Sequence, residues 1–145
     1  MSPVLDRLAE LRLHLEHLRE LRPRVKDPVT LRNDLSLRND VLHSLQTVCQ
    51  VVIDVASELS ARYRLRFQDY TEAVRNLSSI PGLPPVAIRT LEKLPGFRNV
   101  LIHEYVMLDY KRVIEALDGL GAVEELAEAI RRVEAPPAPG RRSDD

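Results

Sequence analysis

The sequence predicts an all-α fold, an antiparallel bundle of about five to six helices. Leu, Glu, Arg and Ala dominate the composition, and Gly occurs only 5 times in 145 residues, a mix that favours helices. Apolar residues recur three and four positions apart through most of the chain, which is the helical period. No stretch alternates apolar and polar residues for long enough to form a strand. Together these patterns are typical of a helical bundle.

A seam of apolar residues predicts the first helix, over about residues 3–22. Its members lie in alternating steps of four and three residues; they are Val4, Leu8, Leu11, Leu15 and Leu18. Pro23 ends this helix, because proline lacks the N–H that a helix interior needs. The seam covers only about two heptads, so it favours a helix that packs on a core or on a second subunit over a long coiled coil.

The central element is predicted to be one long helix, from about residue 28 to residue 61. Asp27 is a favoured N-cap residue and Pro28 suits the first helical position. Apolar residues then recur at helical spacing as far as Leu59. Residues 62–68 read as a polar connection, after which Asp69 is expected to cap a shorter helix that runs to Ile80.

Proline and glycine divide the second half of the chain. The run Pro81-Gly82-Leu83-Pro84 predicts a break, and Pro95-Gly96 is expected to stop or kink the next helix. Gly119 and Gly121 are expected to interrupt the chain again. Helices are predicted over about residues 85–94 and 122–134. Between them, a helix that opens near Phe97 carries the motif to about Leu108 and continues helically from Asp109 through Leu117.

The length and composition fit one domain at residues 1–134, in which 1–22 is either an extension or a divergent first helix. Residues 135–145, rich in proline and charge, predict a disordered tail. The net charge of −1 excludes nucleic-acid binding through bulk positive charge. No apolar run approaches the ~18 residues of a membrane span, and the charged start predicts no signal peptide, so we expect a cytoplasmic protein with no membrane partner.

Metal and thiol chemistry find little support in the sequence. Glu104 follows His103, but position 107 is Met107, so the H-E-x-x-H zinc motif is absent. The single cysteine, Cys49, lies in an apolar run and is expected to be a buried small hydrophobic residue. We therefore expect no metal and no cofactor. Asp54, in the same apolar helix, is equally compatible with pairing to an arginine and with facing a cleft.

One segment concentrates polar functional groups inside an apolar stretch, namely Phe97-Arg98-Asn99-Val100-Leu101-Ile102-His103-Glu104-Tyr105. On an ideal helix Arg98 and Tyr105 are nearly eclipsed, whereas His103 lies about 140° round from Arg98. Asn99 and His103 share a neighbouring face. Arg98 and His103 therefore converge only if the Pro95-Gly96 start distorts the first turn, or if a two-fold dimer brings two such helices to one cleft.

This segment resembles the R-x4-H-x-Y signature of HEPN domains, with Arg98, His103 and Tyr105 in register. The surrounding residues are similar to the HepT branch of that family, in which F-R-N-x-[LIV]-[VI]-H-x-Y is typical. Upstream, Leu45-Gln46 and then Ile53-Asp54-Val55-Ala56 resemble the same branch. The likeness runs from about residue 28 to residue 134.

The resemblance implies a metal-independent endoribonuclease that works as a homodimer, with the two motif helices lining a cleft. It further implies the toxin of a type VII-like toxin–antitoxin pair. Its partner in such a pair is a small nucleotidyltransferase antitoxin of the MNT type, which adenylylates the motif tyrosine, Tyr105 here.

The residue types suit cleavage of RNA by its own 2′-hydroxyl. Histidine exchanges a proton near neutral pH, so His103 is the expected acid or base. Arg98 is expected to hold the phosphate and stabilise its charge in the transition state. Asn99 would orient His103 or the phosphate, and Tyr105 would donate a hydrogen bond or stack on a base.

Two other functions remain open from the sequence. The first is a non-catalytic helical module that binds a nucleotidyltransferase, which would need neither Arg98 nor His103. The second is a generic helical dimerisation protein, for which the leucine seam at residues 4–18 is the best support.

Overall fold

The computed structural model describes residues 2–135 and is entirely helical over that range, with no strand. The predicted all-α class is confirmed; the tail predicted at 135–145 lies, apart from Ala135, outside the described residues. The α-helices are α1 (Pro3–Leu21), α2 (Pro28–Asn33), α3 (Leu35–Arg62), α4 (Tyr70–Asn76), α5 (Pro85–Leu91), α6 (Leu94–His103), α7 (Tyr110–Asp118) and α8 (Leu120–Glu134). Short 3₁₀ turns cover Arg22–Arg24, Leu77–Ser79 and Tyr105–Met107.

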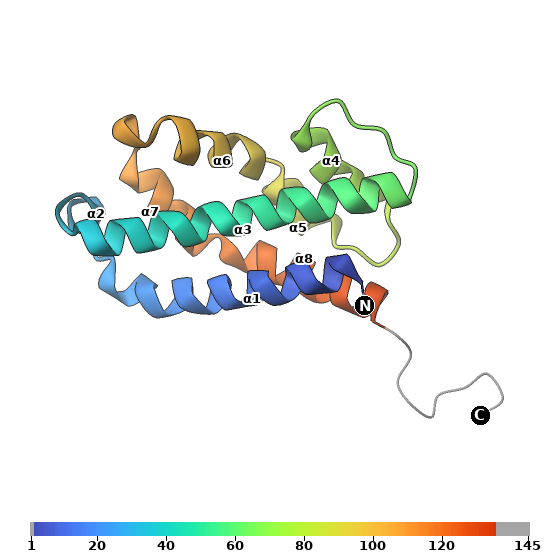
Figure 1. Cartoon of the computed structure of the whole chain (residues 1–145), viewed down its shortest axis with the longest axis horizontal. Coiled ribbons are helices and arrows are strands. Elements are labelled where there is room, and N and C mark those ends of the chain that lie inside the picture. The colour runs from blue at the N-terminus through green and yellow to red at the C-terminus, as the bar shows by residue number, and fades with distance from the viewer. Residues whose placement is uncertain (1, 136–145) are drawn as a thin grey trace, which may run out of the picture.

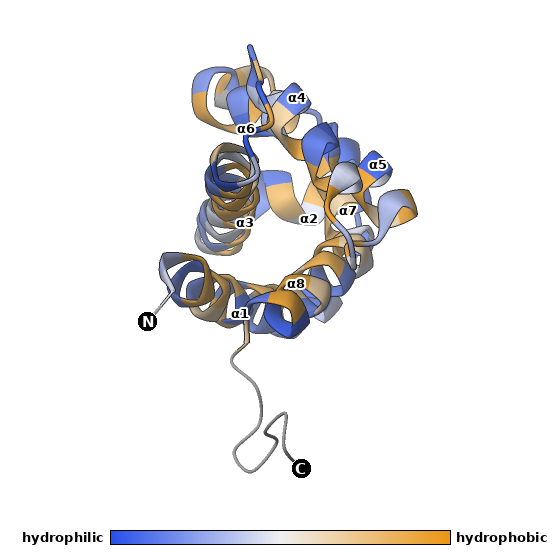
Figure 2. Ribbon diagram, turned by 90° about the vertical axis from the view of Figure 1, so that its right-hand side faces the viewer, coloured by the Kyte–Doolittle hydropathy of each residue, from blue (hydrophilic) through white to orange (hydrophobic). Residues whose placement is uncertain are grey.

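Helix α3 is the axis of the bundle (Figure 1). Helix α1 runs antiparallel along one side of it, while α4 and α6 contact it on the other. Helices α5, α7 and α8 close the remaining side, where α8 contacts both α1 and α5. Viewed end-on, the helices ring a common interior towards which apolar residues face (Figure 2). The buried cluster extends from Val4 in α1 to Ile130 in α8.

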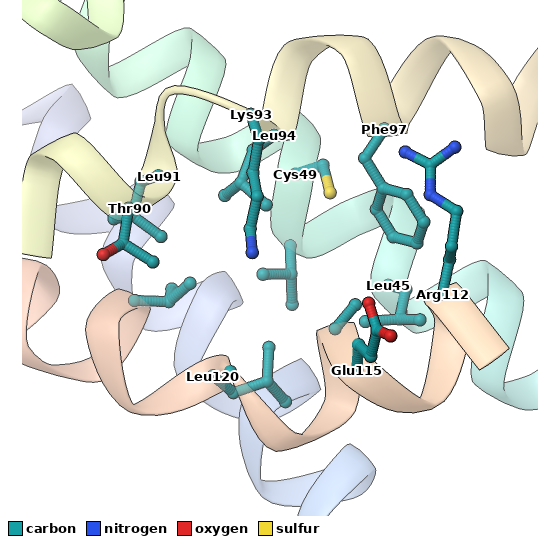
Figure 3. A pocket seen from close by; sticks show the side chains of 14 residues that line it. Leu45, Cys49, Thr90, Leu91, Lys93, Leu94, Phe97, Arg112, Glu115 and Leu120 are labelled. Carbon is teal, nitrogen blue, oxygen red and sulfur yellow. The ribbon is translucent and has the colours of Figure 1, made fainter.

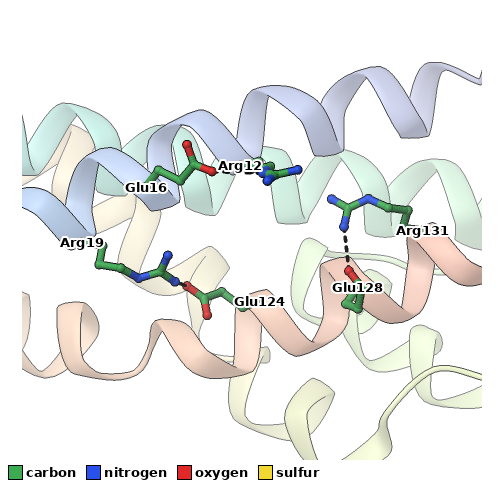
Figure 4. Close-up of polar contacts among 6 residues, drawn as sticks. All are labelled: Arg12, Glu16, Arg19, Glu124, Glu128 and Arg131. Carbon is green, nitrogen blue, oxygen red and sulfur yellow. Dashed lines mark hydrogen bonds and ion pairs between the residues drawn. The ribbon is translucent and has the colours of Figure 1, made fainter.

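The predicted seam of the first helix is confirmed: all five of its residues are buried, and Leu21 continues the row. Ser2 caps α1 by accepting a hydrogen bond from the N–H of Leu5 at 3.5 Å. On the outer surface an ion pair between Arg19 and Glu124 links α1 to α8 (Figure 4). Each helix also carries its own pair nearby, Arg12–Glu16 on α1 and Glu128–Arg131 on α8. Helix α1 therefore belongs to the same packed core as the helices that follow.

The single long helix predicted over 28–61 is wrong in one respect, since the chain leaves helical geometry at Asp34 (φ −108°, ψ 95°). Asp27 caps α2 as predicted, and hydrogen bonds from Thr30 hold the pKa of its carboxyl below the usual value. Asp34 then acts as a second N-cap, because its Oδ1 accepts a hydrogen bond from the N–H of Leu37 at 3.0 Å. An aspartate competes for backbone N–H groups in this way, so the break allows α2 and α3 to point in different directions.

Further breaks also differ from the sequence-based prediction. Helix α5 ends at Leu91, and Pro95 and Gly96 lie inside the first turns of α6. Proline is tolerated there because the N–H groups at a helix start have no intrahelical partner. Gly119 does separate α7 from α8, but Gly121 lies within α8. The break at Asp34 and the one between His103 and Tyr110, where a continuous helix was predicted, raise the number of α-helices in the described range to eight, above the expected five to six.

None of the helices described is both long and apolar enough to traverse a lipid bilayer.

Replacing Asp34 by alanine tests the break between α2 and α3. We expect Asp34→Ala to lower the free energy of unfolding by about 0.5–2 kcal/mol, the usual effect of losing an N-cap. Asp34→Asn keeps an equivalent cap and is expected to match the native protein. Urea unfolding followed by circular dichroism measures both variants. An alanine variant as stable as the native protein would show that the cap does not determine the break.

Candidate active site

Helix α6 carries the motif, and its packing decides where each motif side chain points. Leu94, Phe97 and Leu101 are buried at spacings of three and four, and they face the core. Helix α6 contacts α3 and α4 through this side. Because a helix turns about 100° per residue, Asn99 and His103 fall on the opposite face and are exposed.

Arg98 occupies the boundary between these two faces and is half-buried. Its Nε is buried and has no hydrogen-bond partner. The carbon of its guanidinium lies over the ring of Tyr70, the first residue of α4, at 5.8 Å from the ring centre. Within the described residues, no carboxylate forms an ion pair with Arg98. Arg98 is thus a partly buried guanidinium without a carboxylate partner among the described residues.

The charge of Arg98 also acts on the buried thiol of Cys49 in α3. Burial raises the pKa of the Cys49 thiol to about 12, and the positive charge of Arg98 acts in the opposite direction. The thiol therefore stays protonated near neutral pH and is a poor nucleophile. The predicted burial of Cys49 is confirmed.

Within one chain the structure brings Asn99 and His103 to one face but points Arg98 elsewhere. The first turn of α6 is regular, with the N–H of Phe97 bonded to the carbonyl of Lys93 at 3.1 Å. Distortion at Pro95-Gly96 therefore does not bring Arg98 and His103 together. The other predicted route, a second copy of α6 brought to one cleft, stays a prediction.

The predicted helical alignment of Arg98 with Tyr105 is wrong. Helix α6 ends at His103, because Glu104 adopts non-helical angles (φ −125°, ψ 29°). Tyr105 then opens the 3₁₀ turn Tyr105–Met107. The side chain of Tyr105 lies outside the described part of the structure.

Of the neighbouring polar groups, Asp54 on α3 pairs with an arginine, as one of the two alternatives predicted, and it also lines a surface groove with Tyr70. Its Oδ2 lies 2.9 Å from Nη1 of Arg7, and its Oδ1 accepts a hydrogen bond from Gln50. Tyr70 was not predicted as a site residue. Its position directly after the cap residue Asp69 is the only sign in the sequence, and that sign indicates a helix start rather than a contact with Arg98.

A separate apolar cavity of about 670 Å³, counting the space at its open mouth, lies on the core side of α6 (Figure 3). Leu45, Val48 and Cys49 form its apolar side, while Lys93, Arg112 and Glu115 line its polar side. Arg112 stacks over the ring of Phe97 at 5.8 Å. The exposed face with Asn99 and His103 does not line this cavity. Among the described residues no group of three His, Cys, Asp or Glu is placed to hold a metal ion.

Comparison with known proteins places this site in a family. The curated relatives include the mRNA nuclease HepT of Shewanella oneidensis, 20% identical over 115 residues, which span 79% of this chain and 84% of the relative. A candidate RNase of Archaeoglobus fulgidus is 26% identical over 127 residues, or 88% of this chain and 89% of that protein.

Solved structures share the fold. The tri-AMPylated Shewanella oneidensis HEPN toxin in complex with MNT antitoxin superposes with a TM-score of 0.78 at 19% identity, over 91% of this chain and 99% of that one. A toxin–antitoxin complex with AMP-PNP gives a TM-score of 0.76 at 19% identity, over 89% of this chain and 97% of that one. At these identities the likeness shows the fold.

The sequence pattern of one family covers most of the chain, including α6 and its motif. The pattern described as "Ribonuclease HepT-like" matches residues 11–133, from the middle of α1 to the end of α8. The chain therefore belongs to the HepT-like ribonuclease family.

Proposed function

We propose that this protein is the toxin of a type VII-like toxin–antitoxin pair and that it cleaves RNA without a metal ion, at a cleft between two copies of α6. Arg98 and His103 are the catalytic residues, and Asn99 and Tyr105 support them. The protein acts in the cytoplasm through one helical domain at residues 1–134. The family match over residues 11–133 and the continuous buried cluster support this extent.

The main support for the proposal is the environment of Arg98, which is partly buried and has no carboxylate partner among the described residues. A partly buried guanidinium that no carboxylate neutralises is unfavourable for stability, because desolvation of a charge is costly. Some other arginines pair with carboxylates, as Arg22 does with Asp118 and Arg75 with Glu92. Among the described residues, Arg98 is the arginine with a buried nitrogen, Nε, that has no hydrogen-bond partner. Arg98 instead keeps N–H donors for an anion from outside, and a phosphodiester is the anion that a ribonuclease binds.

The chemistry needs a base, an acid and a charge acceptor around one phosphate. His103 of one subunit removes the proton from the ribose 2′-hydroxyl, and the 2′-oxygen forms a bond to phosphorus. The bond from phosphorus to the 5′-oxygen breaks, and a second imidazole donates the proton that this oxygen takes up. Arg98 stabilises the charge on the phosphate oxygens. The products are a 2′,3′-cyclic phosphate and a free 5′-hydroxyl, so protons and bonds balance without a cofactor.

A homodimer supplies what one chain lacks. One copy of α6 offers a single His103, which faces away from Arg98. Directly beyond it, Val106 and Met107 are 81% and 85% exposed. Adjacent large apolar side chains at the surface are typical of an interface. A two-fold axis near this turn would cover them and set two motif helices side by side.

The antitoxin is expected to be an MNT-type nucleotidyltransferase that transfers AMP to the hydroxyl of Tyr105. The similar fold solved as a tri-AMPylated HEPN toxin with MNT antitoxin supports this partner. AMP attached two residues beyond His103 would add negative charge and bulk where RNA must bind, so cleavage would stop.

Loss of either catalytic side chain should abolish cleavage. We expect His103→Ala and Arg98→Ala to lower the rate of RNA cleavage by roughly 10²- to 10⁴-fold, the usual contribution of a positioned acid, base or charge stabiliser. The assay is cleavage of total RNA in the presence of EDTA. His17→Ala, which removes an exposed histidine paired with Asp40 on the opposite side of α3, is the matched control and should keep full activity. Dependence on added Mg²⁺ would contradict the proposal, as would a fully active His103→Ala.

A charge in the apolar turn should separate the subunits. We expect Val106→Asp to convert a dimer into a monomer and to abolish cleavage, while circular dichroism stays unchanged because the residue is exposed. Light scattering after size-exclusion chromatography measures the mass. Val86→Asp on α5, where the valine is 74% exposed, is the matched control and should remain dimeric. A native protein that is a monomer, or an active monomeric variant, would refute the shared cleft.

Removal of one hydroxyl should protect the toxin from its antitoxin. We expect Tyr105→Phe to take up no AMP and to remain active after incubation with the nucleotidyltransferase and ATP, because the phenol is the acceptor. Intact-protein mass spectrometry and the RNA assay measure the two effects. Tyr110→Phe on α7 should be modified and silenced like the native protein. AMP attached to Tyr105→Phe would place the acceptor elsewhere.

A further inference from the structure

We propose that Tyr70 is the positioning residue of Arg98: its ring holds the guanidinium in place for the RNA phosphate without occupying the N–H groups that must bind it. This inference rests on the proposed role of Arg98 and adds a residue from a different helix, α4, to the site. The observation behind it is the cation–π contact between the two side chains, in which Cζ of Arg98 lies over the ring of Tyr70, 5.8 Å from the ring centre.

A cation–π contact suits an arginine that binds phosphate better than an ion pair would. A carboxylate fixes a guanidinium by accepting hydrogen bonds from its N–H groups, and it also cancels the charge. An aromatic ring attracts the cation through its face, so the N–H groups in the guanidinium plane keep their hydrogen-bonding capacity. Within the described residues, no carboxylate pairs with Arg98 and no group bonds its buried Nε. The ring of Tyr70 is therefore the contact that fixes the end of this side chain.

Tyr70 is itself held at a defined place. It is the first residue of α4, and Asp69 caps that helix by accepting a hydrogen bond from the N–H of Glu72 at 2.8 Å. The Glu72 carboxylate in turn accepts one from the N–H of Gln68, also at 2.8 Å. These two reciprocal bonds fix the turn on either side of Tyr70. Helix α4 contacts both α3 and α6, so the ring has a fixed position relative to the motif.

The exposure of Tyr70 fits a functional contact. The residue is 46% exposed, so its ring is not needed to fill the core. One part of the ring faces Arg98, and the other borders a surface groove shared with Phe67 and Arg7. A half-exposed tyrosine of this kind stabilises the fold little. Its replacement should therefore change the rate of cleavage mainly by altering the position of Arg98.

The test compares Tyr70→Leu with Tyr70→Phe. We expect Tyr70→Leu to lower kcat by roughly 2- to 30-fold with little change in KM, because a cation–π contact of the usual strength is lost where charge develops. Tyr70→Phe keeps the ring and should restore kcat to within about twofold. Tyr63→Leu, at an exposed tyrosine seven positions earlier in the connection, is the matched control and should behave as the native protein. Thermal unfolding verifies that all three variants fold.

Each alternative result overturns the inference in a recognisable way. An unchanged kcat in Tyr70→Leu shows that the ring positions nothing, and equal losses in both variants show that the hydroxyl matters. A rise in KM alone means that Tyr70 stacks on a base of the RNA. Combining Tyr70→Leu with Arg98→Lys should give no further loss; an additive loss would show that Tyr70 acts independently of Arg98.

A second measurement separates this inference from the proposed function. In NMR spectra of the protein labelled with ¹⁵N-arginine, the side-chain signals of Arg98 should carry a ring-current shift that Tyr70→Leu removes and Tyr70→Phe retains. If the native protein does not cleave RNA, the proposed function fails whatever the spectra show. If the shift is absent from an active native protein, the positioning role of Tyr70 fails and the proposed function stands.

Discussion

The packing of α6 on α3 and α4 is the constraint on which the candidate site depends. Three buried residues of α6, Leu94, Phe97 and Leu101, set the rotation of the helix about its own axis. Once that rotation is fixed, the helical period determines the direction of the other side chains of α6. Asn99 and His103 must face outward, and Arg98 must lie at the edge of the contact with α4. A change in the apolar residues would turn the whole motif relative to the bundle.

The electrostatic pattern of the molecule distinguishes Arg98 from the arginines around it. Several surface arginines pair with carboxylates of other helices, as Arg62 does with Glu134 and Arg7 with Asp54. Such exposed pairs contribute little to stability, and their charges are already compensated. Arg98 combines partial burial with an aromatic contact and an unbonded Nε. That combination is unfavourable for stability, because desolvation of a charge is costly. It is the reason for proposing Arg98 as the residue that binds the phosphate.

The end of α6 matters as much as its core. Because Glu104 leaves helical geometry, the motif spans two structures, a helix up to His103 and a 3₁₀ turn from Tyr105. The turn carries Val106 and Met107 into solvent immediately beside the exposed imidazole. The proposed catalytic group, modification site and interface thus lie within five residues of one another, so modification of Tyr105 would act directly beside the proposed cleft.

The amino-acid sequence by itself determined the helical class, the buried seam of α1 and the motif with its family resemblance, because these follow from periodicity and from residue type. Local rules also located Asp27 and Asp69 as caps, since a cap involves groups only a few residues apart. The cap at Asp34 obeys the same local rule, but the apolar period on either side of it predicts one continuous helix. The tertiary structure alone showed the end of α6 at His103 and the pairing of Asp54 with Arg7. It alone brought Tyr70 to Arg98 across 28 positions of the chain, because which helices meet depends on how all the apolar faces are buried together.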